Sequence, residues 1–165
     1  MTTIYLAGGC FWGTQHLMRQ VRGVLSTRCG YANGNGINPS YEEVYTDLTG
    51  FAETVEVCFD EQVISLTTLL RLFFRSIDPL SVNRQGGDVG TRYRTGIYYT
   101  DEALLHDIHY IYKEIEAQYD QPLAVELAPL SNFYPAEAFH QDYLVKNPSG
   151  YCHISPSLIR EAKKI

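Results

Sequence analysis

Residues 3–13 read TIYLAGGCFWG, a short apolar strand that runs directly into two glycines, a cysteine and two aromatic residues. The pattern predicts that Cys10 lies where the strand ends and a helix begins. The first N–H groups of a helix lack partners within the helix, and that end carries partial positive charge. A thiolate there is stabilised, so we expect the pKa of Cys10 to lie below its ordinary value. Phe11 and Trp12 either pack in the core or wall a substrate pocket beside the sulfur.

The composition indicates one globular domain spanning residues 1–165. Hydrophobic residues make up 45% of the chain, enough to bury a single core. The net charge of -6 argues against nucleic-acid binding, and no apolar run is long enough to span a membrane. Residues 6–10 are similar to a lipoprotein cleavage site, but no charged leader precedes them. We therefore expect a cytoplasmic protein with reduced cysteines. Because the four cysteines include no CxxC pair, we expect no structural zinc site.

Strand and helix patterns alternate along the chain. Strand-like runs predict β-structure at residues 3–7, 23–31, 53–59, 96–100 and 124–127. Apolar spacing and capping signals predict helices at residues 10–22, 40–44, 65–77, 101–118 and 135–146, with Ser40 and Glu43 as a capping box. Residues 78–92 are expected to form a loop. This order predicts an α/β layer structure with a mixed sheet, although a parallel doubly wound sheet also fits.

The other cysteines differ in their sequence surroundings. Cys152 follows a stretch rich in glycine and proline, which is mobile enough to bring a second thiol to Cys10. The alternative is an incidental thiol, and the residues alone do not decide. Cys29 and Cys58 lie inside strand patterns and are expected to be packing residues.

Several titratable residues are candidates for proton chemistry. Glu53 is either a carboxyl group whose pKa is raised by apolar neighbours, or a solvated residue at the edge of a strand. His140 and His153 are candidate bases for Cys10, and nothing in the spacing selects either. Asp88 and Tyr93, taken alone, are hydrogen-bonding loop residues.

Seven blocks of sequence resemble the A-type peptide methionine sulfoxide reductases, in the order in which that family carries them. The blocks are GCFWG at 9–13, GYA at 30–32, NPSYEEV at 38–44, TGFAE at 49–53, NRQG at 83–86, DVGTRYR at 88–94 and FYPAE to HQ at 133–141. The resemblance implies a two-layer α/β sandwich with a mixed sheet. It also implies thiol-dependent reduction of methionine S-sulfoxide, in proteins and as the free amino acid, in the repair of oxidised proteins.

The resemblance assigns roles to individual residues. It implies that Cys10 attacks the sulfoxide sulfur and that Glu53 protonates the sulfoxide oxygen, to which Tyr41 and Tyr93 donate hydrogen bonds. The implied substrate-binding residues are Phe11 and Trp12, which hold the methyl group, and Asp88, in the polar lining.

The implied catalytic cycle needs no metal and no bound cofactor. Methionine leaves, and Cys10 remains as a sulfenic acid that a second thiol converts to a disulfide. Cys152 matches the resolving position of the family, and thioredoxin would reduce the Cys10–Cys152 disulfide. No cysteine follows Cys152, so we expect a single resolving residue. We expect the enzyme to act as a monomer, because nothing in the sequence argues for a homodimer.

The chain departs from the common family pattern near the expected site. Phe51 replaces a histidine, which makes the surroundings of Glu53 more apolar and favours its protonated form. Arg92 replaces a glutamine; an inward-facing positive charge would oppose that form, so we expect Arg92 to face outward.

Three other functions remain as alternatives. A cysteine hydrolase or acyltransferase would use Cys10 as nucleophile with a histidine base, and would form an acyl-enzyme. A thiol peroxidase would form the same sulfenic acid but would consume peroxide. A binding module would grip a methionine-like side chain with Phe11 and Trp12 and show no turnover. None of the three explains the other matched blocks.

Overall fold

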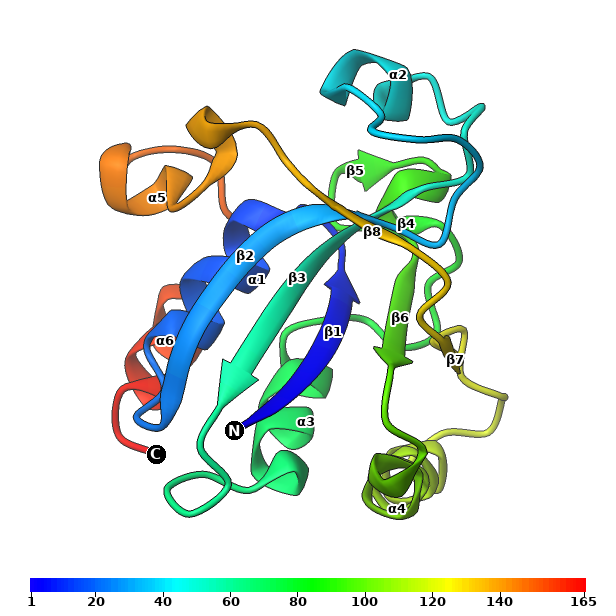
Figure 1. The fold of residues 1–165 in the computed structure, drawn as a ribbon. Coiled ribbons are helices and arrows are strands. Elements are labelled where there is room, and N and C mark those ends of the chain that lie inside the picture. Colours follow the sequence, from blue (N-terminus) through cyan, green and yellow to red (C-terminus); the bar gives the residue numbers. More distant parts are fainter.

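The computed structural model describes residues 1–165, and six of its strands form one sheet (Figure 1). The strand order is β7-β6-β1-β3-β2-β8. The strands are β1 (Thr2–Gly8), β2 (Val24–Ala32), β3 (Ala52–Phe59), β6 (Thr95–Tyr99), β7 (Glu126–Pro129) and β8 (Phe133–Pro135). Neighbouring strands are antiparallel except for β6 and β7, which run parallel. The predicted mixed sheet is confirmed, and the parallel doubly wound alternative is wrong.

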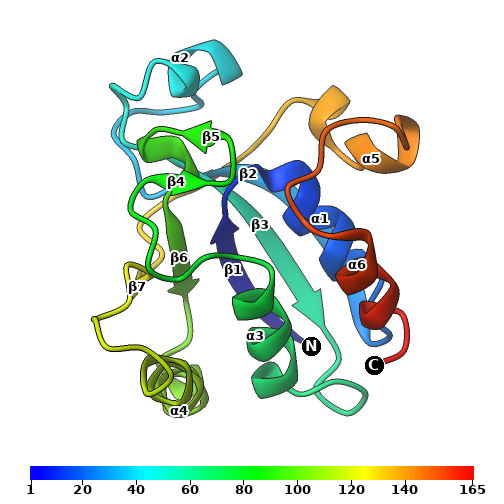
Figure 2. The same ribbon diagram turned by 180° about the vertical axis from the view of Figure 1, so that it is seen from behind.

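The longer helices are α1 (Phe11–Arg19), α3 (Leu66–Arg75), α4 (Leu105–Glu116) and α6 (Pro156–Ala162). Helices α1, α3 and α6 lie over one face of the sheet, and α4 lies beyond the end of β6 (Figures 1 and 2). Helix α1 packs on β2 and β3, α6 lies beside α1, and α4 packs against α3. Their apolar faces and the facing strand residues form one continuous buried core, so the domain has the two layers expected from the family resemblance.

Strand β1 determines the position of Cys10, because hydrogen bonds to a neighbouring strand on each side hold it in the sheet. Ile4 and Leu6 point into the main core, whereas Ala7 belongs to a small cluster with Tyr98 on the opposite face. The strand pairs with β3 on one side and β6 on the other. It ends at Gly8, so the next residues leave the sheet at a position that two neighbouring strands define.

Short elements gather at the end of the sheet where β1 stops (Figure 1). They are α2 (Tyr41–Tyr45), the hairpin of β4 (Arg84–Gln85) and β5 (Asp88–Val89), η1 (Thr91–Tyr93), η3 (Ala138–His140) and α5 (Tyr143–Lys146). The remaining 3-10 helix, η2 (Glu102–Leu104), leads into α4. Helix α2 has the predicted capping box, in which the side chains of Ser40 and Glu43 each accept from the other's backbone N–H.

The helix predicted at residues 135–146 is wrong. Residue 135 belongs to β8, and only η3 and the short α5 are helical within the range. The side chain of Gln141 accepts from the Cys29 N–H and donates to the Cys29 carbonyl, at 2.9 Å each. Asp142 follows with a φ of 55°. These bonds to β2 hold the backbone out of a continuous helix, so tertiary contacts override the local pattern.

The β4–β5 hairpin, η1 and helix α6 were not predicted from the sequence. The segment expected to be a loop, residues 78–92, contains the β4–β5 hairpin, whose turn places Gly86 at a φ of 59°. Helix α6 begins after Ser155, whose side chain accepts from the Leu158 N–H. None of the helices combines the length and apolar character needed to cross a bilayer.

Candidate active site

Cys10 caps the first turn of α1, as predicted. Gly9, with a φ of 85°, makes the sharp turn between β1 and α1. A β-carbon at Gly9 would lie 2.8 Å from Cβ of Gln85, so only glycine fits. The backbone N–H groups of Trp12 and Gly13 are directed at the Cys10 sulfur and stabilise its thiolate form. The helix start therefore supplies the expected anion-stabilising groups.

The expected lowering of the Cys10 pKa is wrong for the resting site. Cys10 is only 8% exposed, and this burial raises the pKa of its thiol well above the ordinary value. The negative charge of Glu53 is the next cause that raises it, and the two backbone N–H groups offset only part of the effect. Protonation of Glu53 would remove that repulsion. The thiol and the carboxyl group are therefore electrostatically coupled.

Glu53 is a buried acid rather than a solvated residue at a strand edge. It lies in β3 and is 1% exposed. The Phe11 N–H donates to its Oε1 at 3.2 Å, and its Oε2 has no partner in the protein. Desolvation raises the pKa of Glu53 to about 8, although the Phe11 N–H and Arg92 partly oppose the shift. The carboxyl group is thus protonated near neutral pH and has one oxygen free to donate.

The charge of Glu53 affects the pKa values of two nearby tyrosines, Tyr41 and Tyr93. Burial and then the charge of Glu53 raise the pKa of Tyr41, in α2, to about 12. The same two causes raise the pKa of Tyr93, in η1. Glu137 fixes Tyr41, because its carboxylate accepts from the Tyr41 N–H at 3.0 Å and from the Tyr31 hydroxyl at 2.8 Å. Both hydroxyls remain protonated hydrogen-bond donors.

Arg92 faces inward, contrary to the expectation. It is 7% exposed and forms an ion pair with Asp47 at 2.5 Å. Its guanidinium carbon lies 4.2 Å from the ring centre of Tyr45 and 4.3 Å from that of Tyr93. The acidic partner and the two aromatic faces offset the cost of burying the charge. Arg92 consequently opposes the rise in the pKa of Glu53.

Trp12 and Phe11 play different structural parts. Phe11 is almost fully buried and packs against Tyr31 and His140, so it is also a core residue. Trp12 is half-buried and stacks on Tyr143, with ring centres 3.8 Å apart. Its indole N–H donates to Nδ1 of His140 at 3.0 Å. His140 is therefore occupied in holding Trp12, and burial lowers its own pKa.

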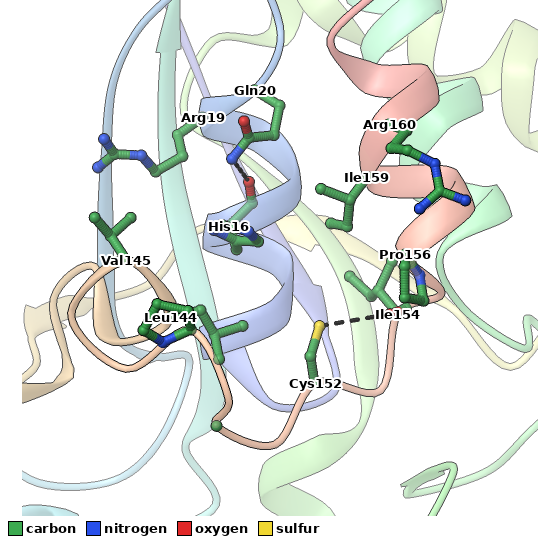
Figure 3. Close-up of a pocket in the computed structure, with 12 residues that line it drawn as sticks. His16, Arg19, Gln20, Leu144, Val145, Cys152, Ile154, Pro156, Ile159 and Arg160 are labelled. Atoms are coloured by element: carbon green, nitrogen blue, oxygen red, sulfur yellow. Dashed lines mark hydrogen bonds between the residues drawn. The ribbon is translucent and has the colours of Figure 1, made fainter.

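Asp88 and Cys152 approach the site from the hairpin and from the C-terminal segment. The Asp88 carboxylate raises the pKa of both Cys10 and Glu53, and burial followed by the charge of Asp88 raises the pKa of Tyr151. A β-carbon at Gly13 would lie 3.3 Å from Sγ of Cys152. Cys152 lines a groove of about 630 Å³ between α1, α5 and α6. Figure 3 shows its sulfur among the other lining residues. All four cysteines are free thiols.

The family model described as peptide methionine sulfoxide reductase matches residues 2–164. The chain belongs to this family. It is 54% identical over 161 residues to peptide methionine sulfoxide reductase MsrA of Lachnoclostridium phytofermentans, covering 98% of this chain and 97% of that protein. The crystal structure of reduced Mxr1 from Saccharomyces cerevisiae is similar, with a TM-score of 0.87 and 38% identity over 93% of this chain and 90% of that one. A structure of Mxr1 in complex with Trx2 matches 86% of this chain and 83% of that one, with a TM-score of 0.60 and 29% identity.

Membership in the peptide methionine sulfoxide reductases confirms the resemblance inferred from the seven blocks. The protein is an oxidoreductase that acts on methionine sulfoxide. The hydrolase, peroxidase and binding-module alternatives are disfavoured accordingly. No group of three or more His, Cys, Asp or Glu side chains is arranged to hold a metal ion.

Two supporting residues of the reductase have roles that were not predicted from the sequence. Glu137, in the matched block at 133–141, holds Tyr41. The sequence makes His140 a candidate base for Cys10, but its Nδ1 accepts from the Trp12 indole and holds that ring. Cys29 is a packing residue, as expected, because it is fully buried and its Sγ donates to the Gln15 side chain at 3.0 Å.

Proposed function

We propose that this reductase uses Cys10 as the nucleophile and Glu53 as the acid that activates the sulfoxide of methionine S-sulfoxide. The observation that carries this proposal is the buried carboxyl group of Glu53, protonated near neutral pH and bonded to the first turn of α1. The same turn directs two N–H groups at Cys10. One helix start therefore joins a thiol and an acid whose pKa values depend on each other.

The proposed reaction transfers oxygen from the substrate to Cys10. Sulfoxide oxygen leaves poorly unless it is protonated, and Oε2 of Glu53 is the free atom that can deliver the proton. The Cys10 sulfur attacks the sulfoxide sulfur and forms an S–S bond, while the protonated oxygen leaves the substrate sulfur as water. Water then adds to the Cys10 sulfur as that S–S bond breaks and releases methionine. Methionine is the reduced product, and the cysteine is oxidised to a sulfenic acid. Tyr41 and Tyr93 are the proposed hydrogen-bond donors to the same oxygen.

We propose that the substrate side chain lies against Trp12 and the edge of Phe11, with Asp88 in the polar lining. The Trp12 ring is held by a stack and a hydrogen bond, so this wall is formed before substrate arrives. Oδ2 of Asp88 is buried without a partner in the protein, which leaves it free to accept from the substrate backbone. Protein-bound and free methionine sulfoxide both present the group that these residues contact.

We propose that Cys152 resolves the sulfenic acid and that thioredoxin reduces the resulting disulfide. Support comes from the contact of Cys152 with the first turn of α1 and from the groove beside it. The relative Mxr1 has been crystallised with Trx2. Every residue in the proposed cycle comes from one chain, so a monomer suffices, and free thiols suit a reducing cytoplasm.

The experiment that tests these roles compares matched cysteine variants on the two sulfoxide epimers. Peptides carrying S- or R-sulfoxide are incubated with wild type, Cys10→Ser and Cys29→Ser, and released methionine is quantified. We expect turnover of the S epimer by wild type and by Cys29→Ser, and none by Cys10→Ser. Turnover of the S epimer by Cys10→Ser would refute the assignment of the nucleophile.

A further inference from the structure

Cys152 is followed by a histidine that packs against the same point on α1. A β-carbon at Gly13 would lie 3.1 Å from Nδ1 and from Cε1 of His153, and 3.3 Å from Sγ of Cys152. The N–H of Gly13 is itself directed at the Cys10 sulfur. Cys10, Cys152 and His153 therefore all lie next to Gly13. Because glycine has no side chain, the Cys152 thiol and the His153 ring can pack against its backbone.

Both ring nitrogens of His153 are buried. The Gly8 carbonyl is the one backbone group that interacts with the ring, so at least one ring nitrogen has no partner in the protein. Nε2 points along the turn before Cys10, because a β-carbon at Gly9 would lie 3.3 Å from it. Burial lowers the pKa of His153, although the Gly8 carbonyl and the Asp88 carboxylate favour its protonated form. The ring is thus a neutral imidazole able to accept and return a proton.

Disulfide formation needs proton transfer at this place. If Cys152 is the resolving thiol, as proposed above, it must lose its proton before it can attack, and burial raises its pKa. The leaving group on the other sulfur is hydroxide, which needs a proton to depart as water. One neutral imidazole that packs with Cys152 against the first turn of α1 can meet both requirements.

We propose that His153 transfers the proton in the resolving step. It takes the proton from the Cys152 thiol, and the thiolate sulfur attacks the sulfur of the Cys10 sulfenic acid. The S–S bond forms as the S–O bond breaks, and the imidazolium returns the proton to the departing hydroxide. The products are the disulfide, one water molecule and a neutral His153, so no external oxidant or base is consumed.

The surroundings of His153 define which charges act on it. Asp88 faces it from β5, and Cys152 precedes it in the chain. His153 also lines a depression of about 320 Å³ that includes Arg75 and Asp78. A second histidine, His16 of α1, lines the groove that also contains Cys152 (Figure 3), and it is the competing proton acceptor.

The experiment follows two events in one reaction without a reductant. Wild type, His153→Gln and His16→Gln are mixed rapidly with a methionine S-sulfoxide peptide and quenched at intervals. Methionine release reports the first step, and mass spectrometry after alkylation separates sulfenic acid from disulfide. For His153→Gln we expect an unchanged methionine burst, disulfide formation slower by about 10²-fold, and accumulation of sulfenic acid.

The pH profile distinguishes proton transfer from a structural role. In wild type the rate of disulfide formation should rise with pH and level off once His153 is neutral. In His153→Gln the rate should keep rising with hydroxide concentration, and added imidazole should restore part of it. The size of the methionine burst measures the correctly folded fraction of each variant, and His153→Asn provides a second substitution.

Three results would overturn the proposal. Disulfide formation at the wild-type rate in His153→Gln would exclude the role. An equal slowing of methionine release would place His153 on Cys10 instead of Cys152. Loss of the resolving step in His16→Gln alone would transfer the role to His16. Absence of a methionine burst in wild type would refute the proposed function itself, which is a separate outcome.

Discussion

Replacing Glu53 with glutamine should stabilise the fold while removing the acid. Glutamine keeps an oxygen that can accept from the Phe11 N–H, but it carries no charge. Desolvation raises the pKa of Glu53 from 4.5 to about 8, so the folded protein holds this proton more tightly than the unfolded chain. The contribution of Glu53 to the unfolding free energy of the wild type is therefore greatest below pH 4.5, and it falls as the pH rises toward 8.

The expected difference follows from that shift. The glutamine variant should exceed the wild type in unfolding free energy by about 1 kcal/mol at pH 5 and about 3 kcal/mol at pH 7. Above pH 8 both states of the wild type are ionised, and the difference should level off at about 5 kcal/mol. Methionine formation should fall severely at every pH, because the proton donor is missing.

Urea unfolding of the two proteins, followed by circular dichroism with a reductant present, measures this difference from pH 5 to 9. Glu102→Gln, at an exposed position in η2, controls for the change of residue type and should alter the free energy by less than about 0.5 kcal/mol. A difference for Glu53→Gln that does not grow with pH would refute the reasoning. Destabilisation at pH 7 would do so as well.

Three further substitutions test other parts of the site. Cys152→Ser should release about one methionine per chain and then stop, since thioredoxin has no disulfide to reduce; continued turnover would identify another resolving thiol. Arg92→Gln should move the alkaline limb of the single-turnover rate to higher pH, because a positive charge that lowers the pKa of Glu53 is lost; an unmoved limb would contradict this. Trp12→Phe should raise the KM for a sulfoxide peptide about tenfold, because the ring loses its hydrogen bond to His140 and moves more freely. An unchanged KM would exclude Trp12 from the substrate pocket.

The parts of the fold that the sequence predicts are those set by local patterns. The segment at 3–13 is correctly predicted as a strand, a glycine turn and a helix start, because each step depends on neighbouring residues. The capping box at Ser40 is likewise local. The helix predicted at 135–146 fails because Gln141 bonds to a strand 112 residues earlier in the chain, which no window of sequence contains.

In the site, as in the fold, local sequence patterns predict some features, and contacts between distant residues determine the others. The apolar neighbours of Glu53 leave it open between a buried acid and a solvated residue, and only the folded chain shows that it is buried and that its pKa is raised. The inward turn of Arg92 depends on Asp47 and two tyrosines that only the folded chain brings together. The pKa of Cys10 depends on a balance between its helix start and its burial, and the sequence reveals only the first of these.

The most direct test of the proposed mechanism is a single turnover of wild-type protein without a reductant. The protein is mixed with a methionine S-sulfoxide peptide, and methionine and the state of each cysteine are followed by mass spectrometry. We predict about one methionine per chain together with a Cys10–Cys152 disulfide, and Cys29 and Cys58 still free. No methionine, with Cys10 shown to be free and reactive, would contradict it.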